Sequence, residues 1–302
     1  MDSSGKKRSA TDSNVSDGRC SVEHEEKIKP YLLQGHEKPK NLGYDTAGIE
    51  YVRFGKYPQG ANGEIEPIIW RVLDIAVNEE NQKTALLMSE LTLDRVPYHK
   101  ECAKINWKNS NIRGWLNGDK IVDGDTNWKE VEPYINSDSN KSFYEAAFSE
   151  LTEDEKGKYI LPYSSGGNGL ASAAADDNTS DTGNDKCPAT TDYVFLLNTA
   201  EAGLYFEEDG KFNEYDWNPL RQAEGTKYAA TRGLWQDDGE WVGKIYAEFK
   251  GKSFWWLRNR DGGGGRSAAY VCGSGEVGGV IVSCLDVNVD LNGVRPCIRV
   301  RF

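Results

Sequence analysis

The chain has 302 residues, of which 38% are hydrophobic and 11% aromatic, so it can build a large core and is too aromatic for a disordered protein. Its formal net charge of −12 disfavours nucleic acid and anionic membranes as partners, because both would repel it. No apolar run approaches the roughly eighteen residues that a membrane-spanning helix needs.

Residues 1–45 are polar and charged, which predicts an extension that is flexible or loosely docked to one ordered domain at 46–302. The basic start of the chain has no apolar segment behind it, so we expect no signal peptide. Without one, the six cysteines are expected to be free thiols, since they show no C-x-x-C pair or metal-type spacing.

Alternating and apolar runs predict strands at 50–55, 67–74 and 84–88, with a hairpin loop at 78–82. Helical spacing follows at 110–116, with Ser110 as the N-cap. It returns at 144–159, where the cap signature that starts at Thr152 divides the stretch into two short helices.

The second half of the chain begins with a Ser/Gly/Ala/Asp-rich stretch at 164–190, which predicts a long surface loop. A strand at 193–197, a helix at 199–206 and Gly-punctuated strands follow it. This order predicts a single α+β domain with an antiparallel sheet, short helices and long loops. Both ends of the ordered part are predicted strands, which suggests that they pair with each other.

Few residues have the pattern of a catalytic or metal site. Only three histidines occur, and His99 lies in a polar loop where an exposed side chain is expected. The acidic runs 207–209 and 237–238 lack a calcium-loop pattern, and the glycines 262–265 lack the Lys-Ser/Thr of a phosphate-binding loop. No G-x-S-x-G motif is present. We therefore predict no catalytic residues, no metal ion and no cofactor.

Residues 259–292 have an unusual composition. Lys, Glu, Gln, Met and Trp make up 63 residues of the chain, but these 34 positions contain one of them, Glu276, where about eight would be expected by proportion. No codon ending in a pyrimidine encodes these five amino acids, so randomising the two adenines of such an Asn codon cannot produce them. The alternative explanation is that Gly-rich strands and turns avoid long charged side chains.

Several segments in order along the chain carry a resemblance to one family. They include Ile-Trp-Arg-Val-Leu at 69–73, the Trp-rich stretch 107–117, Thr-Thr-Asp-Tyr-Val-Phe-Leu-Leu at 190–197, Trp-Trp-Leu-Arg at 255–258, Ala-Ala-Tyr-Val at 268–271 and Gly-Val-Arg-Pro at 293–296. Over about 49–302 the chain resembles an uncharacterised bacterial and phage domain with a C-type-lectin-like fold. That domain is frequently the variable protein of a diversity-generating retroelement, in which a reverse transcriptase introduces errors at template adenines.

The resemblance implies a non-catalytic, receptor-like protein that binds a macromolecule, most simply a protein, and that is cytoplasmic or associated with a phage. Residues 254–302 would then be the variable region with its flanking scaffold. The implied scaffold residues are Trp255, Trp256, Leu257, Arg258, Gly293, Arg295 and Pro296. The implied variable, ligand-facing positions are Arg260, Asp261, Gly263, Gly264, Arg266, Ser267, Tyr270, Cys272, Ser274, Ile281, Ser283, Leu285, Asp286, Asn288 and Asp290. A spacing of two within a strand would place several of them on one face.

Three other readings of the chain remain open at this point. A related enzyme group, the formylglycine-generating oxidases, shares the fold and uses cysteines with copper, for which Cys284 and Cys297 would be the pair. A calcium-dependent sugar binder would need a triplet such as Glu-Pro-Asn, which the chain lacks. An undiversified lectin-like binder is the third.

Overall fold

The computed structural model describes residues 29–34, 37, 48–77, 80–121, 127–130, 141–164, 190–206, 217–241, 244–260, 266–278 and 285–302. The Ser/Gly-rich stretch 164–190, which predicts a long loop, lies outside these residues apart from Ser164 and Thr190. The architecture is mixed α+β, with mostly antiparallel sheets and short helices, as predicted.

The first sheet has the strand order β1-β2-β3-β4-β17-β6, and β9 also pairs with β17. Its strands are β1 (Tyr31–Leu32), β2 (Tyr51–Pro58), β3 (Ile65–Val77), β4 (Lys83–Ser89), β6 (Ile160–Leu161), β9 (Val194–Phe195) and β17 (Cys297–Arg301). The three strands predicted in the first half of the chain are confirmed, and all pairs in this sheet are antiparallel.

Two details differ from expectation in this sheet. The first and last long strands, β2 and β17, do not pair, because β3 and β4 lie between them. Part of the N-terminal stretch is also ordered, since Tyr31 and Leu32 form β1 against Arg53 and Val52 of β2.

The second sheet has the order β14-β13-β12-β16-β5, with β15 also paired to β13. Its strands are β5 (Asp94–Arg95), β12 (Trp255–Arg260), β13 (Ser267–Val271), β14 (Val277–Gly278), β15 (Leu285–Asp286) and β16 (Gly293–Val294). Most pairs are antiparallel, and β12 and β16 run parallel. Two separate two-stranded ladders join β7 (Tyr163–Ser164) to β8 (Thr191–Asp192) and β10 (Glu240–Trp241) to β11 (Lys244–Ile245).

The helices are short and begin at residues whose side chains cap them. They are α2 (Asn111–Asn117), α3 (Phe143–Ala147), α4 (Glu153–Tyr159), α5 (Thr199–Leu204) and α6 (Lys227–Thr231). Ser110 caps α2 as predicted, and Thr152 begins α4 in a capping box with Glu155, which separates α4 from α3. Among the described residues no helix has the length and apolarity needed to cross a membrane.

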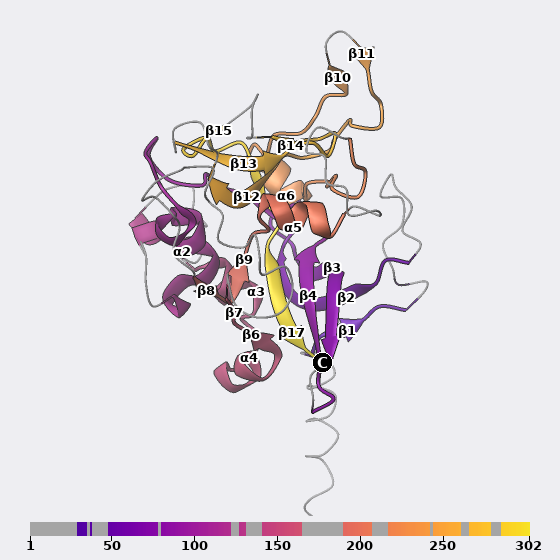
Figure 1. The fold of residues 1–302 in the computed structure, drawn as a ribbon, viewed down its shortest axis with the longest axis vertical. Helices are drawn as coiled ribbons and strands as arrows, with labels where there is room; N and C mark the ends of the chain where they lie inside the picture. Colours follow the sequence, from indigo (N-terminus) through magenta and orange to yellow (C-terminus); the bar gives the residue numbers. More distant parts are fainter. Residues whose placement is uncertain are drawn as a thin grey trace, which may run out of the picture.

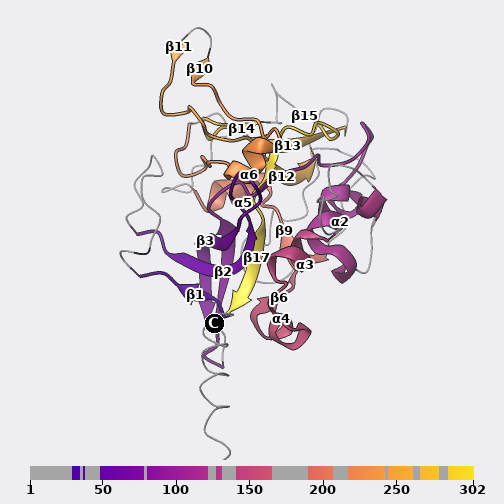
Figure 2. The ribbon, with the colours of Figure 1, turned by 180° about the vertical axis from the view of Figure 1, so that it is seen from behind.

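Figure 1 shows how these elements are arranged. The helices α2, α3 and α4 lie on one side of the first sheet, and the second sheet lies across its upper end, with α5 and α6 near the junction. The β10–β11 hairpin extends above the second sheet, and the view from behind in Figure 2 shows the same projection. The second sheet, which carries the candidate positions, therefore forms one end of the molecule.

His99 is a correction to the expected exposed loop residue. It is only 6% exposed, and its Nδ1 accepts a hydrogen bond from the backbone N–H of Asn111 at 3.3 Å. The backbone N–H of His99 also donates to Val287 in the C-terminal part of the chain. The polar character of the surrounding residues does not reveal this burial, because the covering residues are far away in sequence.

Candidate functional site

The Trp-Trp-Leu-Arg motif forms the start of β12 and is buried on both faces of the second sheet. Trp255 and Trp256 are both 0% exposed, and each indole N–H donates to a backbone carbonyl, of Arg221 at 3.2 Å and of Val96 at 3.0 Å. Because both polar atoms of these large side chains are satisfied inside the protein, the two tryptophans are packed without an unpaired donor.

Arg258, at the end of the same motif, binds a buried carboxylate. Its guanidinium donates from Nη1 and Nη2 to the two oxygens of Glu201 at 2.6 and 2.8 Å, and from Nη1 also to the carbonyl of Leu196. Burial lowers the pKa of Arg258, but the Glu201 charge outweighs this, so the pKa lies above its ordinary value. The pair connects β12 to the start of α5.

Arg295, in the Gly-Val-Arg-Pro motif, lies in a second buried cluster. It donates to the carbonyls of Ser89, Glu90 and Arg221 at 3.1–3.3 Å, and its guanidinium lies 4.9 Å from the ring centroid of Trp255. Burial is the main cause that lowers its pKa to about 9, and the nearby charge of Arg71 adds to this. The motif thus ties the segment before β17 to the turn after β4.

Arg71 completes this cluster through a bidentate contact with Glu90, at 2.9 and 2.8 Å. Burial lowers the pKa of Arg71 to about 10 and raises that of Glu90 to about 7, while the positive charges of Arg295 and Lys252 oppose the shift of Glu90. The Arg71–Glu90 contact also opposes it, because it stabilises the ionised carboxylate.

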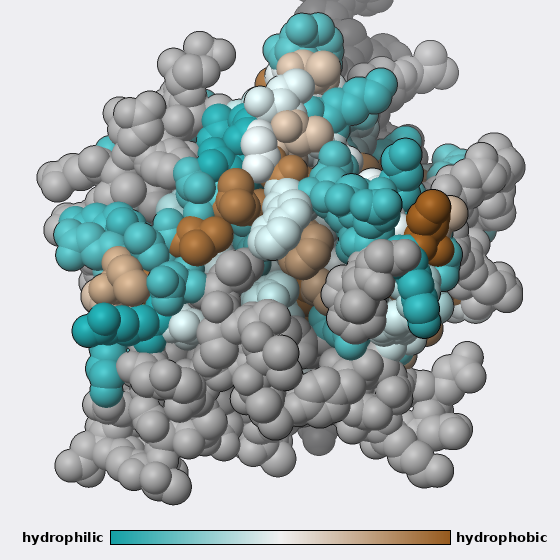
Figure 3. All heavy atoms as spheres, turned by 90° about the horizontal axis from the view of Figure 1, so that it is seen from above, coloured by the Kyte–Doolittle hydropathy of each residue, from teal (hydrophilic) through white to brown (hydrophobic). Residues whose placement is uncertain are grey.

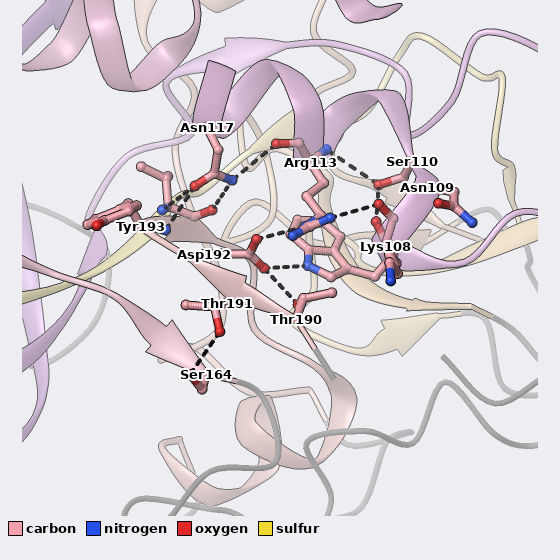
Figure 4. Close-up of polar contacts among 12 residues, drawn as sticks. Lys108, Asn109, Ser110, Arg113, Asn117, Ser164, Thr190, Thr191, Asp192 and Tyr193 are labelled. Atoms are coloured by element: carbon pink, nitrogen blue, oxygen red, sulfur yellow. Dashed lines mark hydrogen bonds and ion pairs between the residues drawn. The ribbon is translucent and has the colours of Figure 1, made fainter. Parts of the chain in front are cut away.

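A third cluster joins two further motifs of the sequence (Figure 4). Arg113 of α2 donates from Nε to Asp192 of β8 at 2.7 Å, and the indole N–H of Trp107 donates to the other oxygen of Asp192 at 2.9 Å. The hydroxyl of Thr190 donates to that same oxygen at 2.9 Å. The amide of Asn117 adds a link between α2 and β9, because it accepts from the backbone N–H of Val194 and donates to its carbonyl.

The candidate variable positions divide into accessible and covered side chains. Arg266, Asp286 and Asn288 are exposed, and Ser267 is half-buried. The pairing of β13 with β15 sets Ser267 opposite Asp286, so these four positions gather at one edge of the second sheet. Figure 3 looks onto this end of the molecule, where the coloured residues are mostly hydrophilic with a few hydrophobic ones among them.

Two candidates are corrected by their burial. Tyr270 and Ser274 are each 6% exposed, so neither side chain faces solvent. Tyr270 packs edge-on to Trp256, with ring centroids 6.4 Å apart, and the Ser274 hydroxyl donates to Glu276 at 3.0 Å. The expected alternation fails in β13 because both faces of this central strand are covered, which leaves Ser267 as its most accessible residue.

The remaining candidate positions are intermediate in exposure, or their side chains are not described. Cys272 is half-buried with its sulfur 3.0 Å from the Ser274 hydroxyl, and burial raises the pKa of its thiol. Asp290 is paired with Arg95 at 2.5 Å. Arg260 and Leu285 lie in β12 and β15, but their side chains are not described. Asp261, Gly263, Gly264, Ile281 and Ser283 lie outside the described residues.

Comparison with known families identifies one match, which covers most of the chain. Residues 82–302 match the domain of unknown function DUF6273. The chain belongs to this family. No curated protein and no solved structure matched the chain. In this DUF6273 protein, the matched region contains the whole second sheet and begins at β4 of the first.

Of the two cysteines considered for an oxidase, the structure describes Cys297. Cys297 is 0% exposed in β17, opposite Met88 and Phe195, and burial raises the pKa of its thiol well above the ordinary value. A buried neutral thiol is a poor nucleophile and a poor metal ligand. Cys284, the other residue of the expected pair, lies outside the described residues.

A small pocket of about 70 Å³ lies elsewhere, between β2 and the turn after α3. Lys29, Arg53, Lys56 and Glu150 line it, together with apolar residues, and none of the candidate positions does. In the described part of the DUF6273 protein, the accessible candidates therefore lie on an open surface away from this pocket.

Sequence reasoning missed the acidic partners of the buried arginines. Glu90, Asp192 and Glu201 are at most 3% exposed, and the buried Asp94 forms an ion pair with the partly exposed Arg232 at 2.8 Å. The available signal was their position next to apolar runs, where an acidic residue is costly unless it is paired. The sequence does not show which arginine each one binds.

Proposed function

We propose that this chain is a non-catalytic ligand-binding protein with a C-type-lectin-like fold, whose C-terminal surface is diversified by retroelement mutagenesis at adenines. One observation carries the proposal: two buried, hydrogen-bonded segments, 255–258 and 293–296, flank a stretch in which Arg266, Asp286 and Asn288 reach solvent. Substitution at such positions changes the surface and leaves the core unaltered.

The ligand proposed for this surface is a protein. Polar and charged positions at the edge of a sheet provide hydrogen bonds and charge contacts, while a stable protein interface needs about 800 Å² on each side. Interface energy is concentrated in Trp, Tyr and Arg side chains. Among the candidate positions whose side chains the structure describes, Arg266 is the exposed residue of these three types, because Tyr270 is buried. We therefore expect this copy to bind a ligand weakly.

The DNA beside the gene provides the decisive test of diversification. We expect a near-copy of the stretch that encodes residues 259–292, differing from it at adenines, next to a reverse-transcriptase gene. If the flanking DNA holds neither, the diversification part of the proposal is wrong, and the chain is an undiversified member of its family.

Binding itself needs a test that does not assume diversification. Randomised peptides displayed on phage can be selected against the wild-type chain and against a variant with Asp286→Ala and Asn288→Ala. If the surface binds protein through these positions, the peptides selected on the wild type should bind the variant at least about tenfold more weakly than they bind the wild type. Equal binding to both proteins would contradict this placement of the site.

A further inference from the structure

The strands β10 and β11 and their flanking residues, described at 237–241 and 244–252, form an arm. The arm projects from the end of the molecule in Figures 1 and 2. Only two residue pairs join its strands, Glu240 with Ile245 and Trp241 with Lys244. Ile245 is 80% exposed, the highest value among the exposed large hydrophobic residues of the described chain.

The base of the arm is held by aromatic contacts. Trp217 packs edge-on against Tyr246 and Phe249, with ring centroids 4.9 Å apart in both cases, and is itself 42% exposed. The backbone N–H of Gly251 donates to the carbonyl of Asp237 at 2.8 Å and closes the base. These contacts fix where the arm leaves the body, but they leave the apolar side chain of Ile245 in solvent.

The two strands of the arm have no further partner among the described strands. An isolated two-stranded hairpin is only marginally stable in water, and unpaired strand edges readily associate with other chains. A projecting arm with an exposed isoleucine therefore has the features of a contact surface.

The charge of the arm indicates which partner it fits. Its exposed charged side chains are of both signs: Asp238, Glu240 and Glu248 against Lys244 and Lys250. The whole chain carries −12, so two copies repel each other over most of their surfaces. A nearly balanced surface with both signs can face its own copy across a two-fold axis, where each Lys can meet a Glu of the other copy.

We propose that the arm is a self-association element through which two copies of this chain form a two-fold dimer, with Ile245 of each copy at the contact. This goes beyond the proposed ligand-binding function and does not depend on it. The arm and Trp217 comprise fewer residues than the 20–30 per side of a standard interface, so the expected affinity is micromolar.

Sedimentation equilibrium of the full chain at about 1–200 μM tests the proposal. The wild type should move from the mass of one chain to that of two across this range. Ile245→Asp should raise the dissociation constant at least about tenfold. Ile65→Asp is the matched control, because Ile65 is also well exposed, at 68%, but lies in β3 of the first sheet. It should leave the dissociation constant unchanged.

A second variant separates loss of the contact from loss of the arm's fold. Lys244→Glu keeps Ile245 and makes the arm acidic. Association of this variant should be weaker than that of the wild type at low salt, and it should recover as added salt screens the repulsion. A wild-type chain that stays monomeric at 200 μM would overturn the proposal. So would an Ile245→Asp variant that dimerises like the wild type, an equal loss in Ile65→Asp, or a Lys244→Glu variant that associates as strongly as the wild type at low salt.

Discussion

Glu201 illustrates, at the scale of single residues, how much one side chain contributes to this protein. Its carboxylate accepts hydrogen bonds from Arg258 of β12, from the Tyr163 hydroxyl at 2.8 Å and from the backbone N–H of Asn198 at the start of α5. Three segments that are distant in sequence are therefore held by one buried group that is 1% exposed.

Neutralising this carboxylate should be costly. Glu201→Gln leaves Arg258 buried without its counter-charge, and breaking a buried pair in this way lowers the free energy of unfolding by about 3–5 kcal/mol. Urea unfolding followed by tryptophan fluorescence measures the loss. Glu153→Gln is the control, because its ion pairs are at the surface and should contribute no more than about 1 kcal/mol. Equal losses in the two variants would show that Glu201 does not have this structural role.

Glu153 should also make the stability of the fold depend on pH. Its side chain is 66% exposed, and hydrogen bonds from Lys120 at 2.5 Å and from Lys156 at 2.8 Å lower its pKa to about 2, from an ordinary 4.5. A carboxylate with a lowered folded-state pKa stabilises the fold above its unfolded-state pKa, and this contribution disappears as the pH falls toward 2. The difference in melting temperature between the wild type and Glu153→Gln should therefore shrink between pH 5 and pH 2.5. A difference that is constant over this range would contradict the assignment.

At this scale, the burial of residues could be predicted from the sequence better than their partners. The Trp-rich motifs indicate core positions because large aromatic side chains in strands bury apolar area. The partner of Arg113 is 79 residues away and that of Arg258 is 57 residues away, so only the tertiary fold brings each pair together. The burial of His99 could not be predicted for the same reason, because Val287, which it contacts, is distant in the sequence.

At the scale of elements, the β2–β3 hairpin depends on two glycines with positive φ in different surroundings. Gly63 in the turn has φ +81° and open space around it, whereas Gly55 at the bulge has φ +67° and lies against α3. A Cβ on Gly55 would be 2.7 Å from the carbonyl oxygen of Ala147. The bulge thus lets the strand approach the end of the helix closely.

The two glycines form a matched pair for mutation. Gly63→Ala should lower the free energy of unfolding by about 1 kcal/mol, because a Cβ is unfavourable at positive φ. Gly55→Ala adds a steric clash to this cost and should lose at least about twice as much. Chemical denaturation of the two variants measures the difference. If Gly63→Ala lowered the free energy of unfolding more than Gly55→Ala, the close contact between Gly55 and α3 would not determine which residues the bulge tolerates.

Most elements of this chain could be predicted from local patterns. Capping residues such as Ser110 and Thr152 act through the next few residues, and the runs of β3 and β4 show their own periodicity. Strand order could not be predicted in this way, because β17 lies between β4 and strands from the middle of the chain. The accessible edge at β13 and β15 also required the structure, since alternation alone wrongly placed Tyr270 on it.

At the scale of the whole molecule, the separation of buried scaffold from accessible edge predicts different tolerances to mutation. A library randomised at Arg266, Ser267, Asp286 and Asn288 should remain folded in most members, because exposed substitutions typically change stability by less than about 0.5 kcal/mol. A library at Trp255, Trp256 and Arg258 should remain folded in few, since removal of one buried Trp costs about 3–5 kcal/mol. Protease resistance of displayed variants, scored by sequencing, measures both. Similar survival of the two libraries would contradict the division.

The place of β17 in the first sheet has a consequence for how errors in the gene are filtered. This strand pairs with β4, β6 and β9, yet its codons follow those of residues 259–292. A frameshift or a stop codon in that stretch would therefore remove a central strand, and the ribosome would release a chain that cannot complete its sheet. Such a product exposes apolar strands and is a substrate for cellular proteases. Only in-frame substitutions would yield a protein that folds and escapes proteolysis. The position of β17 after these codons would therefore remove frameshifted and truncated variants from the cell.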